Sequence, residues 1–272
     1  MTHQHKLGVC TWLFGDLPLP EIARRIQGLG FDGVELMGDL ASYKPAQTAA
    51  VLRDHGLEVL SLTPDNVDLA HPDPAIRSAA VDYYLRLLDF AAALDHPLVS
   101  CHGLVGRVRA ISGQQEERAL FVSAVRRIAE RAQTLGLRVV MEVLNRYEAH
   151  LLTTAEEAIE FVAAVGAGNL GILLDAYHMN IEEANPAEAL RRAGKLLGLY
   201  HAADSNRQGI GRGHTDFRAQ LAALADIGYR GPVILECTAP GPDPFTAIKD
   251  AESRTWLETY LRESREWLLA NL

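Results

Sequence analysis

The feature that most constrains the fold of this 272-residue chain is a repeated unit: an amphipathic stretch, a glycine near its end and a short apolar run. The unit occurs first in EIARRIQGLGFDGVELM and returns in segments such as AQTLGLRVVMEVLN and RRAGKLLGLYHAAD. Glycine just beyond a helix end supplies the left-handed residue that stops the helix. Continuous apolar strands, rather than alternating ones, are typical of a parallel sheet covered by helices on both faces.

Eight such apolar runs occur when the amino-terminal segment KLGVCTW is included, and they predict strands beginning near residues 7, 33, 57, 97, 138, 170, 196 and 232. Eight strands alternating with helices favour a (β/α)8 TIM barrel, an α/β fold of roughly 250 residues. A doubly wound sheet is the alternative, but it would need a glycine-rich phosphate turn after an early strand, and the sequence has none there. We therefore expect residues 1–272 to form one barrel domain, with a closing amphipathic helix in the tail SRTWLETYLRESREWLLANL.

Charge and composition narrow the classes of partner and compartment. The net charge of −9 disfavours a nucleic-acid partner, which would require a basic face. No apolar run reaches the roughly 18 residues of a membrane span, and the first residues lack the apolar region of a signal peptide. Three cysteines without a CxxC pair, Cys10, Cys101 and Cys237, suit free thiols in a reducing compartment. We expect a cytoplasmic protein that binds neither nucleic acid nor membranes.

Four predicted strands carry a side chain that can bind a metal ion at or near their carboxyl ends, where TIM barrels place functional residues. These residues are Glu142, Asp175, His201 and Glu236. They are 33, 26 and 35 residues apart, each about one βα unit, so they should converge at the mouth of the barrel. Such acids can also be buried charges that pair with each other or with arginine. However, three acids in apolar strand ends would repel one another without a cation, and this donor set suits Mn²⁺, Mg²⁺ or Co²⁺.

The segments EVLNRYE, LDAYHMNIEE, HAADSNRQGIGRGHTDF and ILEC, within residues 138–240, come in an order and at a spacing that resemble a known family. They are similar to the ketose 3-epimerases (the D-tagatose and D-psicose 3-epimerase group) of the xylose isomerase-like superfamily of sugar phosphate isomerases and epimerases. The resemblance implies a TIM-barrel isomerase acting on carbohydrates, with one divalent metal, usually Mn²⁺ and sometimes Co²⁺ or Mg²⁺. It also implies a homodimer or homotetramer. Ile210 departs from the family, which often has proline at this position.

The resemblance also assigns roles to residues. It implies that Glu142 and Glu236 are the acid–base pair and that they bind the metal together with Asp175 and His201. Inversion beside a ketone requires one group to remove the proton and another to return it from the opposite face, and the sequence leaves open which glutamate serves which face. A cation bound to the carbonyl and the neighbouring hydroxyl oxygen would stabilise the intermediate enediolate.

Four further residues are candidates for binding the sugar. Glu148, His178 and Arg207 match family residues that bind the O1 and O2 end of the substrate, and His102 follows the fourth strand. Each has a plain structural alternative: a solvated acid, a histidine bonded to backbone, an arginine paired with Asp204 or Asp216, or a buried histidine with its own partner. Arg107 and Arg109 lie between the fourth strand and the next helix, where we expect an exposed loop rather than a lid over the substrate.

Two other activities occur on comparable barrels. An inosose-type isomerase or dehydratase would share the four metal ligands, but NRYE and DAYHMNIEE favour the epimerase. An apurinic endonuclease-like phosphodiesterase would resemble a multi-metal site with additional histidines and a basic groove, which the acidic composition disfavours. A non-catalytic sugar-binding barrel would not need two acids on opposite faces of one carbon. Free hexuloses, pentuloses and keto-uronates all remain candidate substrates.

Overall fold

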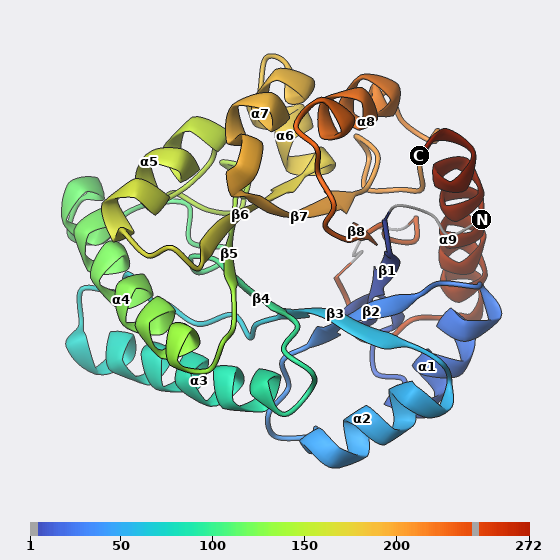
Figure 1. The fold of residues 1–272 in the computed structure, drawn as a ribbon, viewed down its shortest axis with the longest axis horizontal. Helices are drawn as coiled ribbons and strands as arrows, with labels where there is room; N and C mark the ends of the chain where they lie inside the picture. Colours follow the sequence, from blue (N-terminus) through green and yellow to red (C-terminus); the bar gives the residue numbers. More distant parts are fainter. Residues whose placement is uncertain (1–4, 241–244) are drawn as a thin grey trace.

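The computed structural model describes residues 5–240 and 245–272 and shows a closed parallel barrel in which eight strands follow one another around the ring (Figure 1). The ring closes where the first strand pairs with the last. The strands are β1 (Leu7–Cys10), β2 (Gly33–Met37), β3 (Glu58–Thr63), β4 (Leu98–Cys101), β5 (Val139–Glu142), β6 (Leu170–Asp175), β7 (Leu197–Ala202) and β8 (Val233–Leu235). The predicted TIM barrel is confirmed, and every strand begins within one residue of the predicted position.

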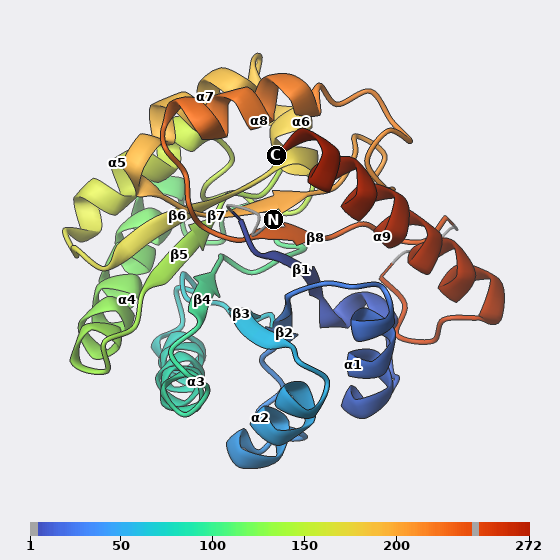
Figure 2. The ribbon, with the colours of Figure 1, turned by 45° about the vertical axis from the view of Figure 1, so that its right-hand side comes forward.

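Helices surround the barrel, as both views show (Figure 1 and Figure 2). They are η1 (Thr11–Phe14), α1 (Leu19–Gly28), α2 (Pro45–Asp54), α3 (Pro74–Ala92), α4 (Gln114–Thr134), α5 (Ala155–Val165), α6 (Ala176–Glu182), α7 (Pro186–Ala193), η2 (Gly194–Leu196), α8 (Phe217–Asp226) and α9 (Ala251–Asn271). The expected closing helix is α9. It lies beside α1 in both figures, and Arg25 on α1 forms an ion pair with Glu258 on α9. No helix in the described part of the chain is both long and apolar enough to cross a membrane.

The helix ends follow the glycine pattern of the sequence. Helix α5 begins with a capping box between Thr154 and Glu157 and ends at Gly166, whose φ of 74° is left-handed. Between α3 and β4, where the sequence has no glycine, Asp95 and His96 both take a φ of 60°. Asp and His tolerate this region better than most side chains, so the same reversal is made without glycine.

The strands are buried almost throughout, which the continuous apolar runs predicted. All residues of β1, β5, β6, β7 and β8 are buried. A few polar side chains are nevertheless buried in or next to these apolar strands, among them Glu35 and Glu142. Since burying an unpaired charge is costly, these polar residues need partners, and they define the candidate site.

Candidate metal and catalytic centre

The four predicted metal ligands come from four consecutive strands at the same end of the barrel. Glu142 and Asp175 are the last residues of β5 and β6, His201 is the penultimate residue of β7, and Glu236 directly follows β8. All four are buried, with exposed fractions between 1% and 8%. Because parallel strands all run in the same direction around a barrel, their carboxyl ends place these side chains at one rim.

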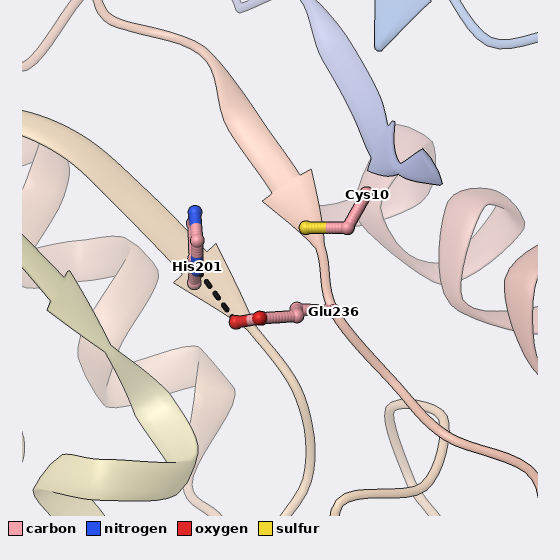
Figure 3. Close-up of side chains that lie close together, drawn as sticks. All are labelled: Cys10, His201 and Glu236. Atoms are coloured by element: carbon pink, nitrogen blue, oxygen red, sulfur yellow. Dashed lines mark hydrogen bonds and ion pairs between the residues drawn. The ribbon is translucent and has the colours of Figure 1, made fainter. Parts of the chain in front are cut away.

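His201 and Glu236 lie in direct contact. The Nδ1 atom of His201 is 2.7 Å from Oε2 of Glu236, and Figure 3 shows the two side chains pointing toward each other from β7 and from the end of β8. The same Nδ1 is 4.0 Å from Oδ2 of Asp175. Burial lowers the pKa of His201, but the carboxylates of Glu35 and Glu236 outweigh it and raise the pKa well above its usual value.

Arg207 places a guanidinium in contact with two of these acids. Its Nη1 is 2.8 Å from Oδ2 of Asp175 and its Nη2 is 3.1 Å from Oε2 of Glu236. Its guanidinium lies 4.7 Å from the ring centre of Tyr177, and its Nε is buried without a hydrogen-bond partner among the described residues. Arg207 therefore lies at the acids of the rim, and its ion pairs are with Asp175 and Glu236 and not with Asp204 or Asp216. Its function there stays a prediction.

The acids of the rim have unequal surroundings. Burial would raise the pKa of Glu236, but Arg207 and His201 outweigh it and hold that pKa below its usual range. Burial and the charge of Glu236 raise the pKa of Asp175 to about 7, although Arg207 opposes the shift. The pKa of Glu142 is raised well above its usual value by burial and then by Glu236. The Glu142 carboxylate has no hydrogen bond or ion pair to any residue in the described ranges.

The rim has more acidic groups than cationic ones, and a divalent cation would balance them. Among the described residues, the ion pairs of the four buried carboxylates, Glu35 included, involve one guanidinium and one imidazole, so acidic groups outnumber the cations paired with them even when His201 is protonated. Oxygen donors with one imidazole are the ligands that Mn²⁺, Mg²⁺ and Co²⁺ accept in proteins. The donor chemistry of the rim therefore fits the predicted metal.

A second candidate group of ligand atoms includes a thiol. Cys10, His201 and Glu236 each offer one atom, and these atoms lie within 4.8 Å of one another (Figure 3). Burial, and next the charge of Glu35, raises the pKa of the Cys10 thiol well above its usual value. Metals bind the thiolate, so a thiol held protonated is a poor ligand, and Cys10 fits the wall of the site better than the metal itself.

Comparison with known proteins agrees with this geometry. Residues 23–270 match the family model of the xylose isomerase-like TIM barrel. The chain is 34% identical to D-psicose 3-epimerase of Agrobacterium fabrum over 78% of this chain and 76% of that protein. A crystal structure of D-psicose 3-epimerase with D-tagatose from Clostridium cellulolyticum H10 has a TM-score of 0.88 at 28% identity, covering 98% of this chain and 99% of that chain. The chain belongs to the ketose 3-epimerase family.

A further relative is named for a different activity. The chain is 29% identical to 3-dehydro-D-guloside 4-epimerase of Escherichia coli, over 93% of this chain and 99% of that protein. D-psicose 3-epimerase and 3-dehydro-D-guloside 4-epimerase are both named for a reaction at a carbon next to a carbonyl carbon. The predicted recognition of the ketose 3-epimerases is confirmed, and with it the expectation of an isomerase that acts on carbohydrates.

Within this ketose 3-epimerase, Asn145 connects two of the predicted sugar-binding residues. Its Nδ2 donates to Oε1 of Glu148 and to Nδ1 of His178, both at 2.8 Å. Because Nδ1 of His178 accepts from Asn145, the ring proton belongs on Nε2, which makes no hydrogen bond to any described residue. Burial and the nearby Arg207 lower the pKa of His178 well below its usual value, so a neutral ring with a free N–H faces the site.

His102 has a partner of its own at one ring nitrogen. Its Nδ1 donates to the carbonyl oxygen of Gly103 at 2.6 Å, so its Nε2 carries the lone pair of the neutral ring. Burial lowers the pKa of His102 and favours that neutral form. The structural alternative of a buried histidine with its own partner thus holds for one nitrogen and leaves the other able to accept a hydrogen bond.

The loop that carries Arg207 is fixed from two sides. The carboxylate of Asp204 accepts backbone N–H groups of Ser205, Gly211 and Thr215. The backbone N–H of Ile210 donates to Oγ of Ser264 on α9 at 2.9 Å. Proline has no backbone N–H and could not make that bond. Ile210, which departs from the family pattern, therefore allows a hydrogen bond to the last helix.

The expectation of an exposed loop holds for Arg109 but is wrong for the side chain of Arg107. Its side chain is 12% exposed and forms ion pairs with Asp68 and Glu117, while Nε2 of His150 is 2.9 Å from Glu117. The loop backbone also pairs with the segment after β5, through a bridge between Arg107 and Ala149. These four side chains, Asp68, Arg107, Glu117 and His150, are called the loop cluster below.

Sequence reasoning also missed Glu35 on β2. It is fully buried, and its Oε2 is 3.1 Å from Nε2 of His201. The available signal was a single glutamate inside the apolar run GVELM, the same signal that identified Glu142.

Proposed function

We propose that this chain epimerises C3 of a ketose or keto-sugar by removing a proton and returning one to the other face. In this proposal one divalent metal ion is held by Glu142, Asp175, His201 and Glu236. The observation that carries it is the gathering of these acidic and imidazole groups at one rim, with negative charge in excess, in a member of the ketose 3-epimerase family.

The two glutamates have positions suited to acid–base work on one carbon. Glu142 ends β5 and Glu236 follows β8, so β6 and β7 separate them around the ring. Side chains from such separated strands can approach a bound substrate from two sides, and one removes the proton that the other replaces. A metal ion bound between them would supply positive charge to stabilise the oxygens beside the deprotonated carbon.

The remaining polar residues are proposed to orient the sugar. His178 offers its Nε2–H to a substrate oxygen, and Arg207 offers a planar donor that suits vicinal oxygens. Glu148 accepts hydroxyl protons while Asn145 holds it in place. His102 accepts at Nε2.

Three finer predictions belong to the same proposal. Mn²⁺ is the expected metal because the resemblance to the ketose 3-epimerases implies it, and Co²⁺ and Mg²⁺ are alternatives because carboxylate and imidazole donors suit all three ions. A reducing cytoplasm is the expected compartment, since Cys10, Cys101 and Cys237 are buried free thiols. A homodimer or homotetramer is the expected assembly.

A panel of sugars in D₂O tests the proposal. Protein stripped with EDTA and reloaded with Mn²⁺, Co²⁺ or Mg²⁺ is incubated with hexuloses, pentuloses, keto-uronates, an inosose and a 3-keto-glycoside. We expect deuterium at C3 of at least one ketose, loss of exchange after EDTA, and recovery with one of the ions, read by proton NMR. Exchange confined to C4 of the 3-keto-glycoside would favour the second candidate, a 4-epimerase, which the nearly full-length match to the E. coli protein supports. Turnover of the inosose alone would contradict both.

A further inference from the structure

Glu35 is a buried carboxylate that the four-ligand site does not include. It lies in the middle of β2 with no exposed surface, and its partners come from three other strands of the ring. Cys10 ends β1, Ser61 and Thr63 belong to β3, and His201 belongs to β7. A bare carboxylate in such a place would be strongly destabilising, so the role of Glu35 depends on what surrounds it.

Each acceptor position of this carboxylate is used. Oε1 accepts from Thr63 Oγ1 at 2.7 Å and from Cys10 Sγ at 3.5 Å. Oε2 accepts from Ser61 Oγ at 2.5 Å and pairs with His201 Nε2 at 3.1 Å. A carboxylate has about four lone-pair sites. With four donors in place, Glu35 has none left to offer to a metal ion or to a substrate, unlike Glu142, which has no such partner.

The bond to His201 has a direction. A carboxylate only accepts, so Nε2 of His201 carries the proton in this contact. The other nitrogen, Nδ1, faces Glu236 at 2.7 Å and Asp175 at 4.0 Å, so by the same rule it donates to Glu236 here, and a metal ion would take the place of that proton. A half-turn of the ring would put its carbon atoms, Cδ2 and Cε1, in the places of these two nitrogens, and the Glu35 contact, itself fixed by Ser61 and Thr63, opposes that rotation.

We propose that Glu35 is a positioning residue that fixes the orientation and tautomer of His201, so that Nδ1 is presented to the metal ion. The inference rests on the proposed function, because it takes His201 to be a metal ligand. Metal-binding histidines commonly donate their second N–H to such a partner, and loss of the partner typically weakens metal binding about 10- to 100-fold.

Metal titration of the whole chain, without substrate, tests the inference. Glu35→Gln keeps the size of the side chain and removes its charge, and we expect Mn²⁺ to bind about 10- to 100-fold more weakly by isothermal titration calorimetry. Glu117→Gln is the matched control, since it removes another fully buried carboxylate outside the site, and its Mn²⁺ affinity should equal that of the wild type. Should Glu35→Gln fail to fold by circular dichroism, Glu35→Asp withdraws the carboxylate from the ring with its charge kept and carries the same expectation.

The orientation and protonation of the His201 ring can be followed separately by NMR. In wild-type protein loaded with diamagnetic Mg²⁺, ¹⁵N NMR should show His201 protonated at Nε2 only, and Glu35→Gln should disturb that pattern. A variant that binds Mn²⁺ as tightly as the wild type, with unchanged His201 nitrogens, overturns the positioning role. If His201→Gln leaves Mn²⁺ binding intact, the metal site of the proposed function is itself wrong, which is a separate result.

Discussion

Two buried ionic clusters lie in this barrel, and they differ in their balance of charge. The loop cluster pairs two acids with one guanidinium and one imidazole, and Glu117 also accepts the backbone N–H groups of Ile111 and Ser112. The rim cluster contains twice as many acids against the same two kinds of cation. Its members are Glu35, Glu142, Asp175, Glu236, His201 and Arg207.

The pKa shifts of the two clusters run in opposite directions. Burial would raise the pKa of Glu117, but Arg107 and the backbone donors lower it to about 2. The pKa values of Glu142 and Asp175 are raised instead, by burial and by Glu236. Acids that are each paired with a cation can be held within the fold, as Asp68 and Glu117 are by Arg107, whereas a surplus of buried acids needs a partner from outside. Burial of charge alone therefore does not mark a functional site, whereas an excess of buried acids over cations does.

The largest expected effect is at the rim. Glu236→Gln should lower the rate of C3 proton–deuterium exchange by at least about 1000-fold, because it removes one of the two proposed acid–base groups and a proposed metal ligand. The far-ultraviolet circular dichroism should remain that of the wild type. Turnover near the wild-type rate in this variant would count against the proposed acid–base pair and would remove the contrast between the clusters.

A smaller effect, of a different kind, is expected in the loop cluster. Glu117→Gln should lower the free energy of unfolding at pH 7 by about 1–3 kcal/mol, because the folded pKa is about 2 against an ordinary value of 4.5. A depressed folded pKa gives stability that is present above pH 4.5 and is lost as the pH falls toward 2. The gap between wild type and variant, measured by urea unfolding, should therefore narrow between pH 5 and pH 3.

The activity of Glu117→Gln tests whether the loop cluster takes part in the reaction. The loop cluster is proposed to hold structure only, so kcat of Glu117→Gln should stay within about threefold of the wild type. A loss comparable to that of Glu236→Gln, in a folded protein, would show that the balanced cluster takes part in the reaction.

The smallest effect is expected at Cys10. Cys10→Ala should change the Mn²⁺ affinity by no more than about twofold, since burial and Glu35 raise the pKa of the thiol and keep it protonated. The Co²⁺-loaded wild type should show no thiolate-to-cobalt charge-transfer absorption. A charge-transfer band that disappears in Cys10→Ala would instead make this thiol a ligand.

The repeat of helix, glycine and apolar strand was enough to predict the barrel, because each unit is local in sequence. The four rim residues could be proposed for a related reason: each is a polar residue at the end of an apolar run, about one βα unit from the next. Their roles as ligands, like the assignment of residues 1–272 to one domain, stay predictions. Glu35 gave the same local signal, but its partner His201 is 166 residues away, so its contact required the fold.

The error at Arg107 has a different origin. A charged residue in a loop is usually solvated, and nothing local to Arg107 indicates otherwise. Its partners Asp68 and Glu117 lie 39 and 10 residues away, one on the segment after β3 and the other in the first turn of α4. The role of Asn145 was also missed, because its two hydrogen bonds join a loop residue to a residue of α6.

The contact between Ile210 and Ser264 makes the last helix part of the site's support. The loop after β7 presents Arg207 to the acids, yet one of its anchors belongs to α9, near the carboxyl terminus of the sequence. A shortened chain that ends before Ser264 would lose the bond to Ile210 and leave that loop held by Asp204, even with every rim residue intact. Truncations or fusions at this end should therefore be expected to alter sugar binding as well as stability.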